Sequence, residues 1–202
     1  MPTLDLRKEL KYLYQPSSKE VAVVEVPEMN FLMLDGEGDP NTSAQYQAVV
    51  TVLFALSYSL KFIVKKGPLA LDYGVMPLEG LWWAEGLSGL TDDRQRWRWT
   101  MMMVQPPCIT ADMVAQAIHE AKAKADAALL AQVRFEPFAE GLCAQIMHIG
   151  PFSAEGPTVA KLHAYIAASG HLPTGKHHEI YLTDIRRADP AKWKTVIRQP
   201  MR

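Results

Sequence analysis

The sequence has little cysteine and almost no net charge. Its 202 residues include two cysteines, Cys108 and Cys143, which are too few for a disulfide framework. Its 21 lysines and arginines nearly balance its 22 acidic residues, which gives a net charge of -1. This balance provides no electrostatic attraction to nucleic acid or to an anionic membrane. We therefore expect a cytoplasmic protein without nucleic-acid or membrane partners, and one large enough for a substantial core.

The sequence also lacks a segment that we would expect to cross a membrane. The amino-terminal stretch MPTLDLRKELKYLY is amphipathic and charged, unlike a signal peptide. A long apolar run covers residues 48–60 (AVVTVLFALSYSL), but it contains Ser57 and Ser59 and is followed by Lys61. Because a membrane-spanning helix needs about 20 mostly apolar residues, the run predicts a buried core helix.

What is present is a repeated order of strands and helices, read from apolar residues at alternating or at helical spacing. The pattern of the first half predicts strands at 21–26, 31–34, 69–83 and 94–107. It also predicts a helix that begins at a capping box of Thr42 and Gln45 and ends at 65–68. The second half predicts strands at 141–149, 176–185 and 193–198 and a helix at 158–169. A helix at 109–133 is expected to connect the two halves.

This order predicts an α+β fold built by tandem duplication of a strand-helix-strand-strand module. A strand runs into a glycine–proline turn before a helix in both halves, as LDGEGDP and as MHIGPFSAEGP. We expect one domain over 1–202, with repeat one at about 20–105, the connecting helix at about 109–133 and repeat two at about 137–202. Its sheet should be antiparallel, with the helices on one face.

The stretch KHHEIYLTDI, residues 176–185, combines a strand pattern with a central carboxylate. Its alternation places Ile180 and Leu182 on one face. The opposite face then carries His177, Glu179, Tyr181 and Thr183. Two interpretations are open: the glutamate lies in solvent, or it lines a pocket.

Aromatic residues provide a candidate wall for such a pocket. Trp97, Trp99 and Met101 fall on one face of the strand at 94–107. Trp82 and Trp83 are adjacent in a strand, so only one of them can face the same pocket. Together with Tyr73, these residues are the candidate wall around Glu179 and Tyr181. Aromatic stripes most often fill a core, so the residues alone favour packing with Glu179 in solvent.

Longer motifs make the sequence resemble a known family. The runs QIMHIGPFSAEGPTVAKLHAYIAASG and HHEIYLTDIRRADPAKWKTVIRQPMR resemble the second half of GyrI-like small-molecule-binding proteins. FLMLDGEGDPN, YGVMPLEGLWWAE and RWTMMMVQPP resemble the first half, and DLRKELKYLYQPS resembles free-standing members. The resemblance implies a duplicated, SHS2-like fold with a ligand cleft between the halves. It also implies a glutamate in that cleft, here Glu179.

The resemblance implies several functions. Relatives include drug-sensing domains of multidrug-responsive transcription activators, a gyrase-inhibitory protein and free-standing hydrolases of cyclopropane-bearing DNA alkylators. The activators carry a helix-turn-helix ahead of this domain, whereas here only about 20 residues precede the first strand, so we expect no DNA-binding regulator. We expect a protein that binds small hydrophobic or cationic aromatic ligands and hydrolyses reactive ones. A non-catalytic drug-binding module and a gyrase-inhibitor-like protein partner stay open as alternatives.

The chemistry expected of Glu179 depends on its enclosure. Aromatic walls would desolvate the carboxylate and raise its pKa. As an anion it would attract a lipophilic cation, and as a base it would activate a water. Tyr181 or Tyr73 would donate a hydrogen bond to the carbonyl oxygen that becomes a phenol. The expected catalytic residues are Glu179, Tyr181 and Tyr73, and the expected ligand-binding residues are Trp82, Trp83, Trp97, Trp99 and Met101.

Two other signals predict no chemistry. No pair among the histidines and cysteines has the spacing of a zinc site, and His177 and His178 point apart in a strand. We therefore expect neither a metal nor a cofactor. Glu155 lies in the turn GPFSAEGP, where a charge or cap at the start of a helix explains it.

Overall fold

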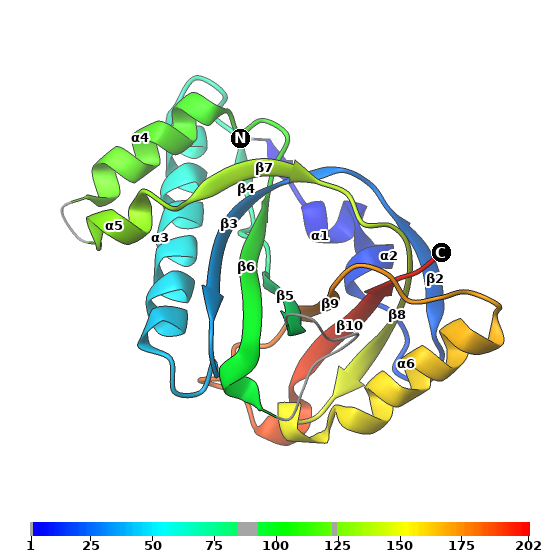
Figure 1. Cartoon of the computed structure of the whole chain (residues 1–202). Helices are drawn as coiled ribbons and strands as arrows, with labels where there is room; N and C mark the ends of the chain where they lie inside the picture. The colour runs from blue at the N-terminus through cyan, green and yellow to red at the C-terminus, as the bar shows by residue number, and fades with distance from the viewer. Residues whose placement is uncertain (1, 85–92, 123–124) are drawn as a thin grey trace.

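The computed structural model describes residues 2–84, 93–122 and 125–202. It is an α+β fold built on one curled, antiparallel sheet of eight strands, in the order β2-β8-β10-β9-β5-β6-β3-β7 (Figure 1). In chain order these strands are β2 (Ala22–Val26), β3 (Met29–Glu37), β5 (Leu78–Ala84), β6 (Trp97–Gln105), β7 (Arg134–Phe138), β8 (Gly141–Ile149), β9 (His177–Tyr181) and β10 (Lys194–Pro200). A separate parallel pair joins β1 (Thr3–Leu4) to β4 (Asp72–Tyr73).

Six α-helices lie in the described ranges. They are α1 (Leu6–Glu9), α2 (Lys11–Tyr14), α3 (Ala44–Lys66), α4 (Ala111–Ala121), α5 (Ala127–Leu130) and α6 (Gly156–Ala168). The expected α+β class and antiparallel sheet are confirmed.

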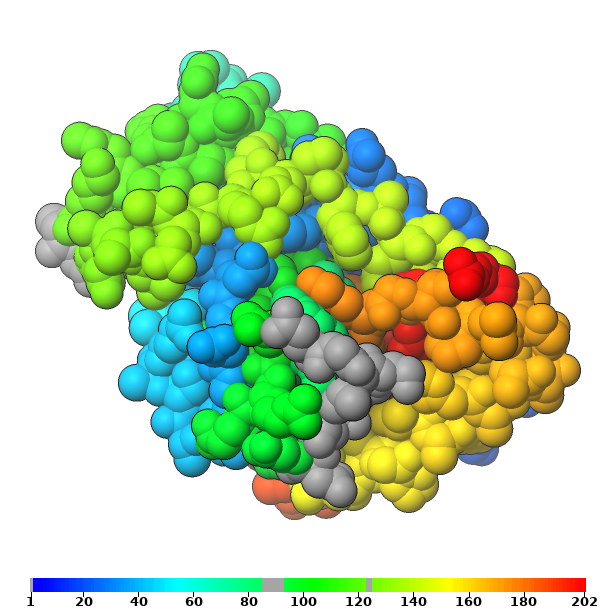
Figure 2. Space-filling view, in the orientation of Figure 1, coloured from blue at the N-terminus to red at the C-terminus, as the bar shows by residue number. Residues whose placement is uncertain are grey.

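The two halves of the sheet have the same internal order. β3, α3, β5 and β6 form a strand-helix-strand-strand unit in the first half, and β8, α6, β9 and β10 form one in the second. Within the sheet the first unit is ordered β5-β6-β3 and the second β9-β10-β8, and the two meet where β5 pairs with β9. Figure 2 shows the first half, in blue to green, against the second, in yellow to red. The order fits the expected pair of modules; the duplication itself stays a prediction, because strand order describes arrangement and not ancestry.

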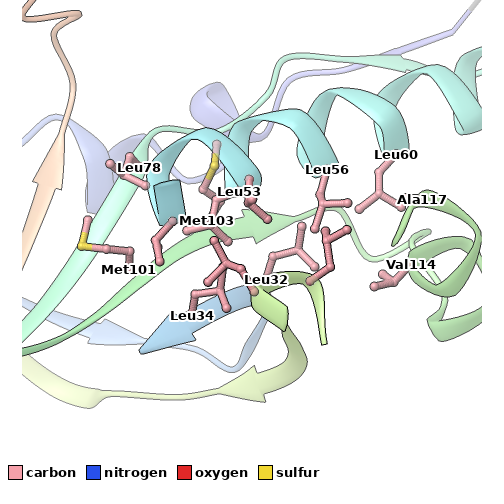
Figure 3. Packing of buried hydrophobic residues seen from close by; sticks show 14 of the residues in the cluster. Leu32, Leu34, Leu53, Leu56, Leu60, Leu78, Met101, Met103, Val114 and Ala117 are labelled. Carbon is pink, nitrogen blue, oxygen red and sulfur yellow. The ribbon is translucent and has the colours of Figure 1, made fainter. Parts of the chain in front are cut away.

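The long helix α3 forms the core of the first half. Its inward residues Leu53, Leu56 and Leu60 pack against leucines and methionines of β3 and β6 (Figure 3). By length and composition α3 could cross a membrane, a test that core helices also pass. Its buried Ser57 accepts a hydrogen bond from Gln105 Nε2 at 3.0 Å. The predicted core helix is therefore confirmed.

The longer helices share one face of the sheet, and short helices occupy the other. α6 packs through Leu162 and Ile166 on β8 and β10, on the same face as α3. On the opposite face, α1 and α2 lie inside the curve of the sheet (Figure 1), where Leu13 joins a second core cluster with Ile180 and Val196. The sheet is thus covered on both sides, by helices of very different length.

Two predicted helix boundaries were wrong. The N-cap of α3 is Ser43 and not Thr42, because the Ser43 hydroxyl accepts the Tyr46 N–H at 3.2 Å. The expected helix over 109–133 is two helices, since α4 ends at Ala121 and the Asp126 carboxylate caps a new helix by accepting the Ala128 N–H at 2.8 Å. The chain then continues as β7, an edge strand that tolerates Pro137 because one side of an edge needs no donor.

Candidate functional site

A row of paired residues across the sheet locates the site between the two longer helices. The row is continuous from β8 through β10, β9, β5 and β6 to β3, and its members share the face that α3 and α6 cover. Its residues are Ile146, Ile197, Glu179, Gly80, Met101 and Leu34. Apolar side chains under each helix thus flank a central glutamate and glycine, and the Glu179 side chain is 14% exposed.

The strand β9 holds Glu179 with its own neighbours. His177 Nε2 lies 3.1 Å from Oε1, and the Tyr181 hydroxyl donates to Oε2 at 2.9 Å. The Tyr181 oxygen in turn accepts the Trp82 indole N–H at 2.9 Å. Because residues two apart on a strand share a face, the predicted alternation around Glu179 directly produces this clamp.

The carboxylate of Glu179 is held in its ionised form. Burial opposes ionisation, but hydrogen bonds from His177, Tyr181 and Glu155, together with the charge of His177, lower the pKa of Glu179 below its ordinary value. The expectation of a raised pKa was therefore wrong for Glu179. That expectation rested on desolvation by the aromatic walls. The three hydrogen-bond donors, which stabilise the charged form, were not foreseen.

A second carboxyl, Glu155, faces Glu179. Glu155 occupies the N-cap position of α6, yet its side chain makes no capping bond. The residue is 8% exposed, and its Oε1 is buried without a hydrogen-bond partner among the described residues. Burial, the charge of Glu179 and a hydrogen bond to Glu179 raise the pKa of Glu155 to about 9. The expected role as a helix cap was wrong, because the side chain turns toward the sheet.

Aromatic rings from the first half pack beside this acidic pair. Trp82 and Trp99 are 4% and 0% exposed. Tyr46 of α3 lies with its ring centroid 5.3 Å from that of Trp99 and 6.1 Å from that of Trp82, and Trp97 lies 5.7 Å from Trp82. Met101 is fully buried in the same cluster. Sequence reasoning missed Tyr46, whose pKa is raised by burial and by the charge of Glu179.

Two of the expected site residues lie elsewhere. Trp83 faces away from Trp82, and its ring carries the Lys176 ammonium 3.3 Å from the centroid. Tyr73 lies on β4, outside the eight-stranded sheet, where burial and the nearby Cys108 raise its pKa. The structure therefore brings together Glu179, Tyr181, Trp82, Trp97, Trp99 and Met101, and leaves Trp83 outside this group. Tyr73 belongs to the same hydrophobic core as Trp82 and Met101, but its hydroxyl has no hydrogen-bond partner among the described residues.

Gly80 allows the groups of the site to approach one another. A Cβ at this position would lie 2.7 Å from Trp82 Nε1, 3.1 Å from the Tyr181 hydroxyl and 3.2 Å from Met101 Sδ. The absent side chain therefore gives room to the Trp82–Tyr181 hydrogen bond. On the other side of Tyr181, the Phe152 ring lies edge-on with its centroid 5.7 Å away, so residues of both halves enclose the pair.

The described surface has two sizeable hollows away from Glu179. One of about 640 Å³ lies between the end of α3 and α4, lined by Phe62, Leu69 and Met113. Another of about 450 Å³ lies beside α1 and α2, against Met147 and Ile149. At the candidate site itself, acidic and aromatic side chains lie in contact with one another.

Comparison with known proteins assigns the family. The model of the GyrI-like small molecule binding domain matches residues 19–202. The chain belongs to the GyrI-like family. Among solved structures, an uncharacterized conserved protein from Listeria innocua is 41% identical, with a TM-score of 0.89 over 98% of this chain and 100% of that one.

Two further structures extend this comparison. A hydrolase from Listeria innocua is 40% identical, with a TM-score of 0.87 over 99% of this chain and 100% of that one. The EcmrR C-terminal domain is 15% identical, with a TM-score of 0.55 over 91% of this chain and 97% of that domain, and shares the fold alone. No curated protein matches the chain. The GyrI-like resemblance seen in the sequence motifs is thus confirmed over nearly the whole chain.

Proposed function

We propose that this GyrI-like protein binds small hydrophobic compounds at Glu179 and hydrolyses reactive ones, such as cyclopropane-bearing DNA alkylators. The observation that carries the proposal is an ionised carboxylate beside aromatic rings, clamped by His177 and Tyr181 at the junction of the two halves. The 40% identity to a protein described as a hydrolase supports the same class of reaction. Two free cysteines agree with a reducing cytoplasm as the place of action.

In the proposed reaction Glu179 acts as a general base. Ring opening of a cyclopropane fused to a dienone adds one water: the water oxygen bonds to the ring CH2, and the broken C–C bond supplies electrons that turn the carbonyl into a phenolate. Glu179 accepts a proton from the attacking water, a role that suits a carboxylate kept ionised at neutral pH. Tyr46 and Trp97, the partly exposed rings of the cluster, provide flat apolar surface for the ligand.

A non-catalytic function is the alternative. A carboxylate beside indole and phenol rings also suits a lipophilic cation, with cation–π attraction of about 0.5 to 2 kcal/mol per ring. A protein of this kind would sequester or sense such compounds without changing them. Product formation separates the two functions.

The test is the Glu179→Gln variant, incubated with a cyclopropane-bearing dienone and followed by mass spectrometry. We expect the wild type to form the hydrated, ring-opened product and the variant to lose about 100-fold or more in rate. Tryptophan fluorescence titration should still detect ligand binding, since the rings remain. Glu28→Gln is the matched control, because Glu28 is exposed. A wild type that binds the compound without forming product would select the alternative.

A further inference from the structure

We infer that Glu155 is the proton donor of this site, the group that protonates the oxygen developing on the substrate while Glu179 deprotonates water. The inference rests on the proposed function. It assigns the acid of the pair, a role that sequence reasoning gave to Tyr181 or Tyr73.

The surroundings of both tyrosines disfavour them as the donor. The Tyr181 hydroxyl donates to Glu179 Oε2 at 2.9 Å and accepts from Trp82. Burial and the charge of Glu179 raise the pKa of Tyr181 well above its ordinary value, whereas the pKa of Glu155 is about 9, so Glu155 is the stronger acid. Tyr73 lies on β4 in the same core as Trp82 and Met101, and burial raises the pKa of its hydroxyl, which makes it a weaker acid than Glu155. Tyr181 is therefore a group that positions Glu179, and the proton must come from elsewhere.

Glu155 has the geometry of a buried acid. It is 8% exposed and lies against Glu179. Its Oε1 is buried and has no hydrogen-bond partner among the described residues, although buried polar atoms normally have one. Glu155 is the N-cap residue of α6, a position where a side chain can accept backbone N–H groups, yet its side chain makes no such bond. A buried carboxyl that keeps its proton beside the base is a group that can protonate a substrate oxygen.

The groups that face Glu155 keep its proton in place. Glu179 disfavours a second negative charge, because two buried carboxylates in contact cannot both ionise without a large cost. Burial and Glu179 raise the pKa of Glu155 to about 9, while the pKa of Glu179 is lowered, so the two carboxyls separate into an acid and a base. Other titratable groups also lie around the pair among the described residues. They are His177 and Tyr181 of β9, Tyr46 of α3, His163 of α6 and His148 of β8. The His148 ring lies within hydrogen-bond distance of the Thr158 hydroxyl and of the Pro151 carbonyl.

Glu155 and Glu179 together account for every proton that moves in the reaction. Glu155 gives its proton to the phenolate oxygen formed when the C–C bond breaks, and Glu179 takes one proton from the attacking water. A proton then passes from Glu179 to Glu155 along the hydrogen bond between them, which restores the starting state. One water is consumed, no net proton is released, and no cofactor is required.

The first test uses the ligand-free protein and does not depend on the substrate. In 13C NMR of protein labelled at the glutamate carboxyls, we expect one buried carboxyl to keep its proton at neutral pH and to titrate near pH 9. This resonance should vanish in Glu155→Gln and persist in Glu28→Gln. If the resonance that Glu155→Gln removes belongs to a carboxyl that is ionised at pH 7, the inference is overturned.

The second test measures turnover of a cyclopropane-bearing dienone. We expect Glu155→Gln to bind the compound but to lose about 100-fold or more in rate, with Glu155→Asp recovering part of it. The wild-type rate should fall as the pH rises toward 9, and the residual rate of Glu155→Gln should lack this decline. Wild-type turnover with an unimpaired Glu155→Gln variant would overturn the donor role alone. Absence of product from the wild type would instead refute the proposed function, and the donor role with it.

Discussion

Two polar clusters lie on opposite faces of β9, and they differ in charge balance. Glu179 belongs to the cluster under α3 and α6, whereas its neighbour His178 belongs to a cluster under α2. The Glu179 cluster contains two carboxyls in contact, Glu155 and Glu179. The His178 cluster pairs its acids with bases. Adjacent residues of one strand thus enter two very different electrostatic environments.

The His178 cluster is an ion network with little access to water. His178 lies between Glu140, at 2.8 Å, and Glu79, at 3.0 Å, and Arg198 lies 3.2 Å from the same Glu140 oxygen. The Tyr14 hydroxyl of α2 donates to Glu79 at 2.7 Å. The four charged side chains are between 0% and 2% exposed. The two carboxylates outweigh the effect of burial and raise the pKa of His178 to about 9.

The difference separates a structural cluster from a reactive one. In the His178 network each charged side chain has an opposite partner, so the cost of burial is compensated, although Glu140 Oε1 has no hydrogen-bond partner among the described residues. In the Glu179 cluster two carboxyls are in contact, so one of them must stay protonated. A cost in stability at an unbalanced site is typical of groups kept for function. The charge balance, and not burial alone, distinguishes the two faces.

The largest effect is expected from breaking the balanced cluster. Arg198→Met would remove the partner of Glu140 and the donor to the Leu13 carbonyl and Gln145, leaving two carboxylates for one histidine. Removing one member of a buried ion pair costs about 3 to 5 kcal/mol. Urea unfolding should show this loss. The same substitution at Arg186, whose side chain is 85% exposed, should change stability by less than about 0.5 kcal/mol.

Glu155→Gln should increase the stability of the folded protein, by less than Arg198→Met reduces it. The ordinary pKa of this carboxyl is 4.5, and folding raises it to about 9. Between these pH values the folded protein holds a proton that the unfolded chain has released, so this group makes stability fall as the pH rises. Glutamine has no such proton, and we expect the variant to be more stable than the wild type by on the order of 2 kcal/mol at pH 8, with the difference shrinking toward pH 5. Parallel stability curves over this range would contradict the assignment of the proton.

The sequence predicted faces and elements better than partners. Alternation placed Glu179 and Tyr181 together, and helical spacing located α3, because both patterns are local. The sequence could not show that Tyr46, which lies on a helix, contacts Trp82 and Trp99, which lie on two different strands. The pairing of His178 with Glu140 and Arg198 likewise depends on the register of separate strands. Burial of Glu155 required the docking of α6, which no pattern near the residue reveals.

Gly80→Ala should give the smallest of the three effects. Gly80 pairs with Glu179 in the sheet, and the added methyl carbon would lie 2.7 Å from Trp82 Nε1. Relief requires movement of Trp82 or of the Tyr181 hydroxyl, which would weaken the bond between them and loosen the clamp on Glu179. Overpacking of this kind costs about 1 to 3 kcal/mol, and we expect the lower end because side-chain atoms, and not backbone, stand in the way.

The measurements that check this prediction are urea unfolding and the tryptophan emission spectrum, since Trp82 would leave its present environment. Gly74→Ala is the matched control, because a Cβ at Gly74 meets nothing within 4 Å. The two faces of β9 should respond differently to this substitution. A methyl group at Gly80 faces the Glu179 cluster and should leave the titration of His178 unchanged, whereas a shift in both clusters would mean that β5 and β9 move together. Unchanged stability and emission would show that the site has room for a side chain at this position, contrary to the tight approach described above.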